Sequence, residues 1–106
     1  MPKFLMEAKF TAPGLKGVQS DGGSARKEAV RKAVESVGGK LESFHFAFGD
    51  NDTYTIMDLP DNEAAAAISL AVSASGALTS KIVVLLTPEE ADTAVRRSVD
   101  YRAPGA

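Results

Sequence analysis

The sequence predicts an α+β fold with the ferredoxin-like order of elements, β-α-β-β-α-β, and an extra C-terminal helix. Three observations lead to this prediction. Residues Lys3–Phe10 alternate between two sets of side chains, which is typical of a half-buried strand. Residues Lys40–Leu59 contain two β-patterned runs around a Gly-Asp-Asn-Asp turn, which indicates a hairpin. Helical spacing of apolar residues follows both the first strand and the hairpin, so we expect a four-stranded antiparallel sheet with helices on one face.

The segment after the first strand is predicted to be a connection over residues 11–23, because Pro13 and four glycines interrupt it. Leu15 and Val18 are spaced for one helical turn, so part of the connection is expected to coil. Lys16 among these glycines suggests an anion site as an alternative. The Gly-Lys-Ser/Thr ending of a phosphate-binding loop is absent, so the plain connection is favoured.

The next helix is predicted over Ser24–Val37, where apolar residues recur at i, i+3, i+4 and i+7. The hairpin strands follow at Lys40–Phe48 and Thr53–Leu59. A second helix is expected to begin at Pro60-Asp61-Asn62-Glu63, because Asp or Asn accepts hydrogen bonds from free backbone N–H groups at a helix start.

The last strand is predicted over Ala77–Leu86, and its apolar run Ile82–Leu86 favours a central position in the sheet. Thr87-Pro88-Glu89-Glu90 is a capping-box helix start. The final helix is expected to reach about Val99 and to turn its alanines and valines inward. We therefore expect one ferredoxin-like domain over residues 1–99 and a flexible tail over residues 100–106.

The two faces of the predicted sheet differ in composition. The strongly apolar set is expected to face the helices and comprises Phe4, Met6, Ala8, Phe10, Phe44, Phe46, Phe48, Tyr54, Ile56, Ile82, Val84 and Leu86. The mixed set is expected on the other face and comprises Leu5, Glu7, Lys9, Leu41, Ser43, His45, Thr53, Thr55, Met57, Lys81, Val83 and Leu85. Apolar residues among charges fit a face that stacks on a second copy and encloses a partly polar space.

Composition excludes several classes of function. The 106 residues carry a net charge of −2 without a Lys/Arg run, which argues against a nucleic-acid partner. No run of about 20 apolar residues suggests a membrane span. Early charges argue against a signal peptide, so we expect a cytoplasmic protein. Cysteine is absent and histidine occurs once, so neither a metal site nor a cofactor is predicted.

Several motifs together resemble the GYD domain family of small bacterial proteins. They are the first strand ending at Thr11, Gly14-Leu15, Gly38-Gly39-Lys40-Leu41, Phe44–Gly49, the turn Gly49–Asp52, Pro60-Asp61-Asn62-Glu63 and Thr87-Pro88-Glu89-Glu90. In the turn that names the family, Gly49 and Asp52 match, whereas Asn51 stands where the tyrosine would be. The resemblance covers roughly residues 2–97. It implies ferredoxin-like subunits paired sheet to sheet, as in dimeric α+β barrels, and no established biochemical activity.

Candidate site residues lie on the mixed face and at the turn. His45 is a candidate general acid or base, because its usual pKa lies near neutrality, although a hydrogen-bonded structural histidine is the simpler interpretation. Lys9, Thr55 and Lys81 are candidate ligand-binding residues. Asp52 either contacts a ligand at the mouth of the barrel or only stabilises the turn.

Three functional hypotheses follow. The first is a small-molecule-binding or stress-related module that forms a homodimer or a larger homo-oligomer through the sheet face. The second is a cofactor-free enzyme, such as a monooxygenase or an isomerase, which rests on analogy of fold. The third is a purely structural or interaction protein.

Overall fold

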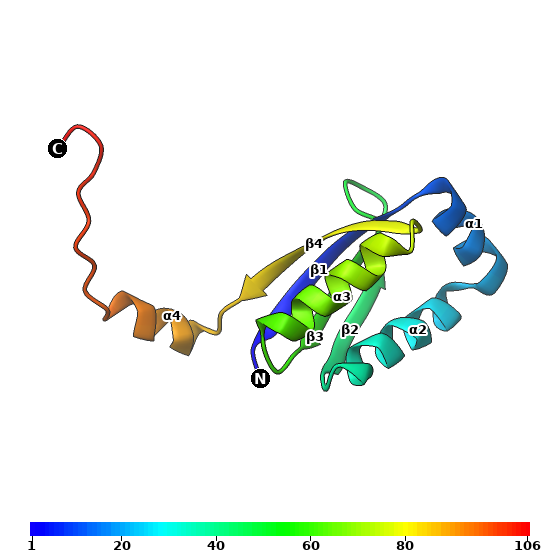
Figure 1. Ribbon diagram of the computed structural model, residues 1–106, viewed down its shortest axis with the longest axis horizontal. Coiled ribbons are helices and arrows are strands. Elements are labelled where there is room, and N and C mark those ends of the chain that lie inside the picture. Colours follow the sequence, from blue (N-terminus) through cyan, green and yellow to red (C-terminus); the bar gives the residue numbers. More distant parts are fainter.

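The sheet has four antiparallel strands in the order β2-β3-β1-β4, and the computed structural model describes residues 1–106. Helices α2 and α3 lie on one face of this sheet (Figure 1). The elements in chain order are β1 (Lys3–Phe10), α1 (Ala12–Asp21), α2 (Gly23–Ser36), β2 (Lys40–Phe46), β3 (Thr53–Asp58), α3 (Asn62–Ala74), β4 (Leu78–Leu85) and α4 (Pro88–Val95). The predicted α+β class and ferredoxin-like order are therefore confirmed.

The core lies between the sheet and helices α2 and α3. Burial of apolar surface here provides the main stabilisation of the fold. The buried apolar cluster comprises Phe4, Met6, Val30, Val34, Leu41, Met57, Leu59, Ala64, Ala65 and Ile68. Helix α3 contributes two alanines, which let its backbone lie close to the strands. The Asp61 carboxylate caps this helix by accepting from the Ala64 N–H at 2.8 Å, as its sequence predicts.

Residues 12–21 form a helix, so the prediction of a connection over residues 11–23 is wrong for most of its length. Thr11 caps α1, because its hydroxyl oxygen accepts from the Gly14 N–H at 3.3 Å. The Thr11 hydroxyl also donates to the Gly76 carbonyl at 2.8 Å, and its N–H donates to the Ala77 carbonyl at 3.0 Å. The helix is thus held at its start by the turn before β4, a contact distant in sequence.

The predicted faces of β2 are partly wrong. A register shift between Leu41 and Ser43 marks a β-bulge. The extra residue turns Leu41 toward the helices, where it is buried, while His45 stays on the opposite face. The strand ends at Phe46, and Phe48 lies beyond it, fully exposed, rather than in the core.

The predicted faces of β3 are reversed. Thr53, Thr55 and Met57 are buried beneath the helices, with exposed fractions of 2%, 0% and 0%. The reason is the register, which pairs Met57 with the core residue Phe4. Directly opposed residues in a sheet point to the same face. Ile56 and Tyr54 therefore lie on the face away from the helices.

Strand β4 is an edge strand, so the predicted central position is wrong. The central strands are β1 and β3, and Val84 of β4 is 56% exposed. Helix α4 has its predicted capping box, but none of its residues is buried, which corrects the expected inward packing. Figure 1 shows α4 and the last residues leading away from the sheet. None of the helices combines the length and the apolar character needed to cross a membrane.

Candidate functional site

The sheet face away from α2 and α3, here called the open face, carries rows of side chains that cross the strands. Ser43, Ile56, Leu5 and Val83 are successive cross-strand partners and make one row. Three of these four side chains are apolar, although no element of the chain covers them. A sheet face exposed to water is normally polar. This apolar row therefore resembles a surface that another molecule covers.

The next row along the strands is polar. It runs from His45 on β2 through Tyr54 and Glu7 to Lys81 on β4. A hollow of about 560 Å³ lies at this end of the open face, and we call it the open-face hollow. Its lining residues are Glu7, Lys9, Asp50, Asn51, Tyr54, Thr79, Ser80 and Lys81. Strands β1 and β4 form its base, and the loop between β2 and β3 bounds it.

The charged groups of the open-face hollow are not engaged in ion pairs. The ion pairs of the structure are Lys3 with Glu42, Lys3 with Asp58 and Arg31 with Glu28, all outside the hollow. Two ammonium groups and two carboxylates line it, from Lys9, Lys81, Glu7 and Asp50. The hollow thus offers balanced positive and negative charge to a ligand.

Two further polar groups in the hollow are already paired with each other. The Asn51 amide donates to the Tyr54 hydroxyl oxygen at 3.3 Å. Because Tyr54 accepts in this bond, its own O–H proton stays available for a ligand.

Only some of the predicted site residues come together. Lys9 and Lys81 both line the open-face hollow. His45 lies next to Tyr54 on the open face but outside the lining, and its side chain makes no hydrogen bond. Thr55 lies on the helix side of the sheet, fully buried, because of the reversed faces of β3. The ligand-binding roles of these residues stay predictions.

Asp52 holds the hairpin loop against β1. One carboxylate oxygen accepts from the Phe10 N–H at 2.9 Å. Its own N–H donates to the Ala8 carbonyl, and its carbonyl accepts from the Ala47 N–H, both at 2.8 Å. The side chain thus satisfies a backbone donor at the end of β1, where the β3 pairing stops. This structural contact goes beyond the turn stabilisation considered from the sequence.

Sequence reasoning missed Tyr54 and the loop residues Asp50 and Asn51 as members of the hollow. The sequence analysis expected Tyr54 to face the helices, whereas the structure places it on the open face. The signal that would have found it is the pairing of β3 with β1, which sets Tyr54 opposite Glu7. The loop residues carry no comparable signal, because their position depends on how the loop folds over the sheet.

A charge cluster occupies the other end of the open face. The Lys3 ammonium group donates to the Asp58 carboxylate at 2.9 Å and also to the Glu42 carboxylate. Hydrogen bonds to these two carboxylates, that of Glu42 first, raise the pKa of Lys3 above its usual 10.5. Because these charges satisfy one another, this cluster is a poorer ligand site than the open-face hollow.

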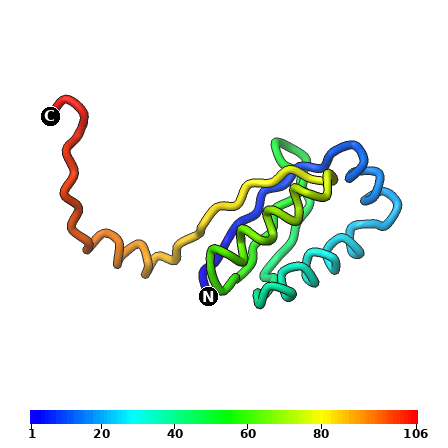
Figure 2. The backbone as a smooth tube through the Cα atoms, in the orientation of Figure 1, coloured from blue at the N-terminus to red at the C-terminus, as the bar shows by residue number.

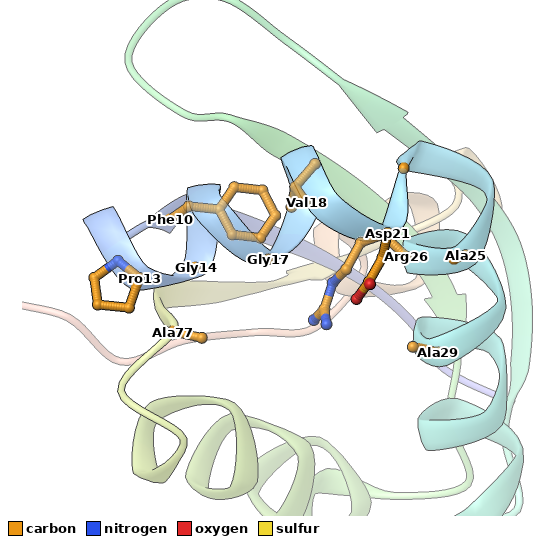
Figure 3. A pocket seen from close by; sticks show the side chains of 11 residues that line it. Phe10, Pro13, Gly14, Gly17, Val18, Asp21, Ala25, Arg26, Ala29 and Ala77 are labelled. Atoms are coloured by element: carbon orange, nitrogen blue, oxygen red, sulfur yellow. The ribbon is translucent and has the colours of Figure 1, made fainter.

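A smaller hollow of about 190 Å³ lies on the helix side, among α1, the first half of α2 and Ala77, which precedes β4 (Figure 3). The guanidinium carbon of Arg26 lies 6.0 Å from the centre of the Phe10 ring, within cation–π range. Phe10 also stacks on Phe46, with 6.4 Å between ring centres. Lys16, the residue of the alternative anion site, does not line this hollow. Small residues form most of its wall, namely Gly14, Gly17, Gly22, Ala25, Ala29 and Ala77.

The arrangement offers no cluster of three or more His, Asp or Glu side chains suited to hold a metal ion. The open-face hollow presents charged groups from β1, β4 and the loop between β2 and β3, and a phenol hydroxyl from β3, and such groups suit contacts with a polar ligand. A proton-transfer role for His45 would require a neighbouring group to orient the imidazole, and its side chain has no such hydrogen bond.

Comparison with known proteins yields one match. The family model of the GYD domain matches residues 4–95, which is most of the chain. The chain finds no match among curated proteins or among solved structures.

Proposed function

We propose that this protein, which belongs to the GYD domain family, is a small-molecule-binding protein that acts as a homodimer. In this proposal two open faces stack on each other, and each closes the open-face hollow of the other. The ligand is a small polar molecule that carries both a positive and a negative group. The observation that carries the proposal is the set of unpaired, balanced charges from Lys9, Lys81, Glu7 and Asp50 in one hollow.

Support for the dimer comes from the apolar row of the open face. Leu5 and Ile56 are only half-buried, and Val83 is 42% exposed. Stacked sheets lie about 10 Å apart with interdigitating side chains, which would remove this row from water. A two-fold dimer brings the same patch of both copies together, so an apolar row in the middle of the face suits it.

The dimer is tested by sedimentation velocity over a range of protein concentrations. Wild type is expected to sediment as a dimer. Val83→Lys places a charge in the apolar row and is expected to shift the equilibrium to monomer. Leu70→Lys is the matched control, because Leu70 is 72% exposed on α3, on the helix side. A wild type that stays monomeric, or equal behaviour of the two variants, would overturn the sheet-face dimer.

Ligand binding is tested by NMR titration of the ¹⁵N-labelled protein with three small probes that carry both charged groups, the anionic group alone or the cationic group alone. These are glycine as a zwitterion, acetate as an anion and methylammonium as a cation. Of the three probes, glycine is expected to cause the largest chemical-shift changes at the amides of Lys9, Tyr54 and Lys81. Lys81→Gln is expected to lower the affinity for glycine several-fold. The control Lys40→Gln changes an exposed lysine outside the hollow. If none of the three probes moves these amides, the binding proposal fails, and a stable dimer would then favour a purely structural role.

A further inference from the structure

The segment Leu86–Val99, which we call the C-terminal arm, makes no contact that would hold it to its own chain. Every residue from Leu86 to the last residue is exposed. The hydrogen bonds of the arm all join residues within it, such as Thr93 to the Glu89 carbonyl. Figure 2 shows the arm continuing away from the end of β4. It therefore gains nothing from the core.

The start of the helix in the arm, α4, is nevertheless favoured by local hydrogen bonds and by its sequence. The Thr87 hydroxyl oxygen accepts from the Glu90 N–H at 3.1 Å, and the Glu90 carboxylate accepts from the Thr87 N–H at 2.9 Å. Pro88 occupies the first turn, where its missing N–H costs nothing. An eight-residue helix is still marginal in water on its own, since isolated helices shorter than about 12–15 residues rarely persist. A surface to pack on would stabilise it.

The arm also has an uncovered apolar side. Ala91, Ala94 and Val95 recur at helical spacing in α4. The helix ends at Val95 rather than at the expected Val99, and Val99 lies in the extended segment beyond it. Val95 is 84% exposed, Val99 is 78% exposed and Leu86 is 60% exposed. Because of the arm, the radius of gyration is 16.7 Å, against about 13 Å for a compact chain of 106 residues. These side chains are large enough to contribute to an interface.

We propose that the C-terminal arm packs on a second copy of the chain, so that the two copies exchange arms. This inference rests on the sheet-face dimer of the proposed function. The arm continues β4, and Val83 and Leu85 of that strand belong to the open face, so the arm starts at the rim of the stacked sheets. A stable interface buries about 800 Å² per partner. The apolar row of the open face is narrow, and the arms add three large apolar side chains from each copy to it.

The arm exchange is tested with a mixed dimer. Cysteine is absent from the chain, so Thr93→Cys gives a single site for a nitroxide label on the polar side of the arm. The labelled protein, without ¹⁵N, is mixed with ¹⁵N wild type, and subunits are exchanged by dilution and reconcentration. Line broadening in the ¹⁵N copy then reports only contacts between copies. It is expected at amides of the edge strands β2 or β4, and a label at Lys27→Cys on α2 is expected to leave these amides sharp.

A second measurement separates the arm from the sheet face. Val95→Asp with Val99→Asp is expected to weaken the dimer at least tenfold in sedimentation, whereas Thr93→Asp, on the opposite side of the helix, changes it less than twofold. The arm exchange is wrong, and the sheet dimer stands, if wild type is a dimer without line broadening between copies and the valine double variant dissociates no more than Thr93→Asp. If wild type is a monomer without broadening, both proposals fall.

Discussion

Replacing Thr55 by valine is expected to stabilise the protein. Thr55 is fully buried in the middle of β3, with Met6 and Phe44 as its cross-strand partners. Its hydroxyl has no hydrogen-bond partner. Valine has nearly the same shape, so Thr55→Val removes the buried hydroxyl without opening a cavity.

The size of the effect follows from the cost of an unpaired buried polar group, which is about 1–3 kcal/mol. Removing the hydroxyl relieves this cost, and imperfect packing of the new methyl group offsets part of the gain. We therefore expect about 1 kcal/mol of added stability. For a domain of this size, that corresponds to a rise in Tm of about 4–8 °C. Thr55→Ser is the matched control, because it keeps the hydroxyl and removes a buried methyl group, which costs about 1 kcal/mol.

The assay is urea unfolding followed by circular dichroism, at one protein concentration for all variants so that self-association contributes equally. A loss of more than about 1 kcal/mol in Thr55→Val would refute the reasoning, because it would show that the hydroxyl has a partner. Glycine titration of the same variant adds a second readout. Since Thr55 faces the helices, its replacement is expected to leave the response of the open-face hollow unchanged.

The remaining predictions concern α1 and the charge cluster of β1. Gly14→Ala is expected to destabilise the protein by about 1–3 kcal/mol in urea unfolding, because its Cβ would lie 2.0 Å from the Ala77 carbonyl oxygen. Gly17→Ala on the same helix meets nothing within 4 Å and is expected to stabilise by about 0.5–1 kcal/mol, so equal effects of the two would contradict this geometry. For Lys3, whose pKa is raised, the ion pairs contribute fully below pH 10.5 and are lost as the pH rises through the raised value. The stability difference between wild type and Lys3→Met is therefore expected to shrink above pH 10.5, and a difference that stays constant there would argue against these ion pairs.

Local signals were enough to predict the order of the strands and of the helices α2, α3 and α4, but not the helix α1. The alternation in Lys3–Phe10, the capping residue Asp61 and the capping box at Thr87 each act over a few residues, so the printed sequence contains the whole signal. The order and spacing of short motifs were likewise enough to suggest the GYD domain family, which the comparison confirms.

The open-face hollow was only partly predictable. Lys9 and Lys81 were found because alternation places them on one face of regular strands. Tyr54 and Thr55 were exchanged between faces, because β3 has polar and apolar residues in both of its alternating sets. Neither choice is better by composition, and only the pairing of Phe4 with Met57 decides between them.

The sequence by itself therefore determined the four strands, the helices α2, α3 and α4, and the family, whereas α1 was predicted as a connection. The tertiary structure alone decided which face of β3 is buried, that β4 lies at an edge, and that Asp52 reaches the Phe10 N–H. It also decided that the apolar side of α4 stays uncovered within one chain. The physical reason is the distance along the chain over which each interaction acts. Capping and alternation depend on neighbours within a few residues, whereas register, strand order and helix docking depend on contacts between residues far apart in the chain.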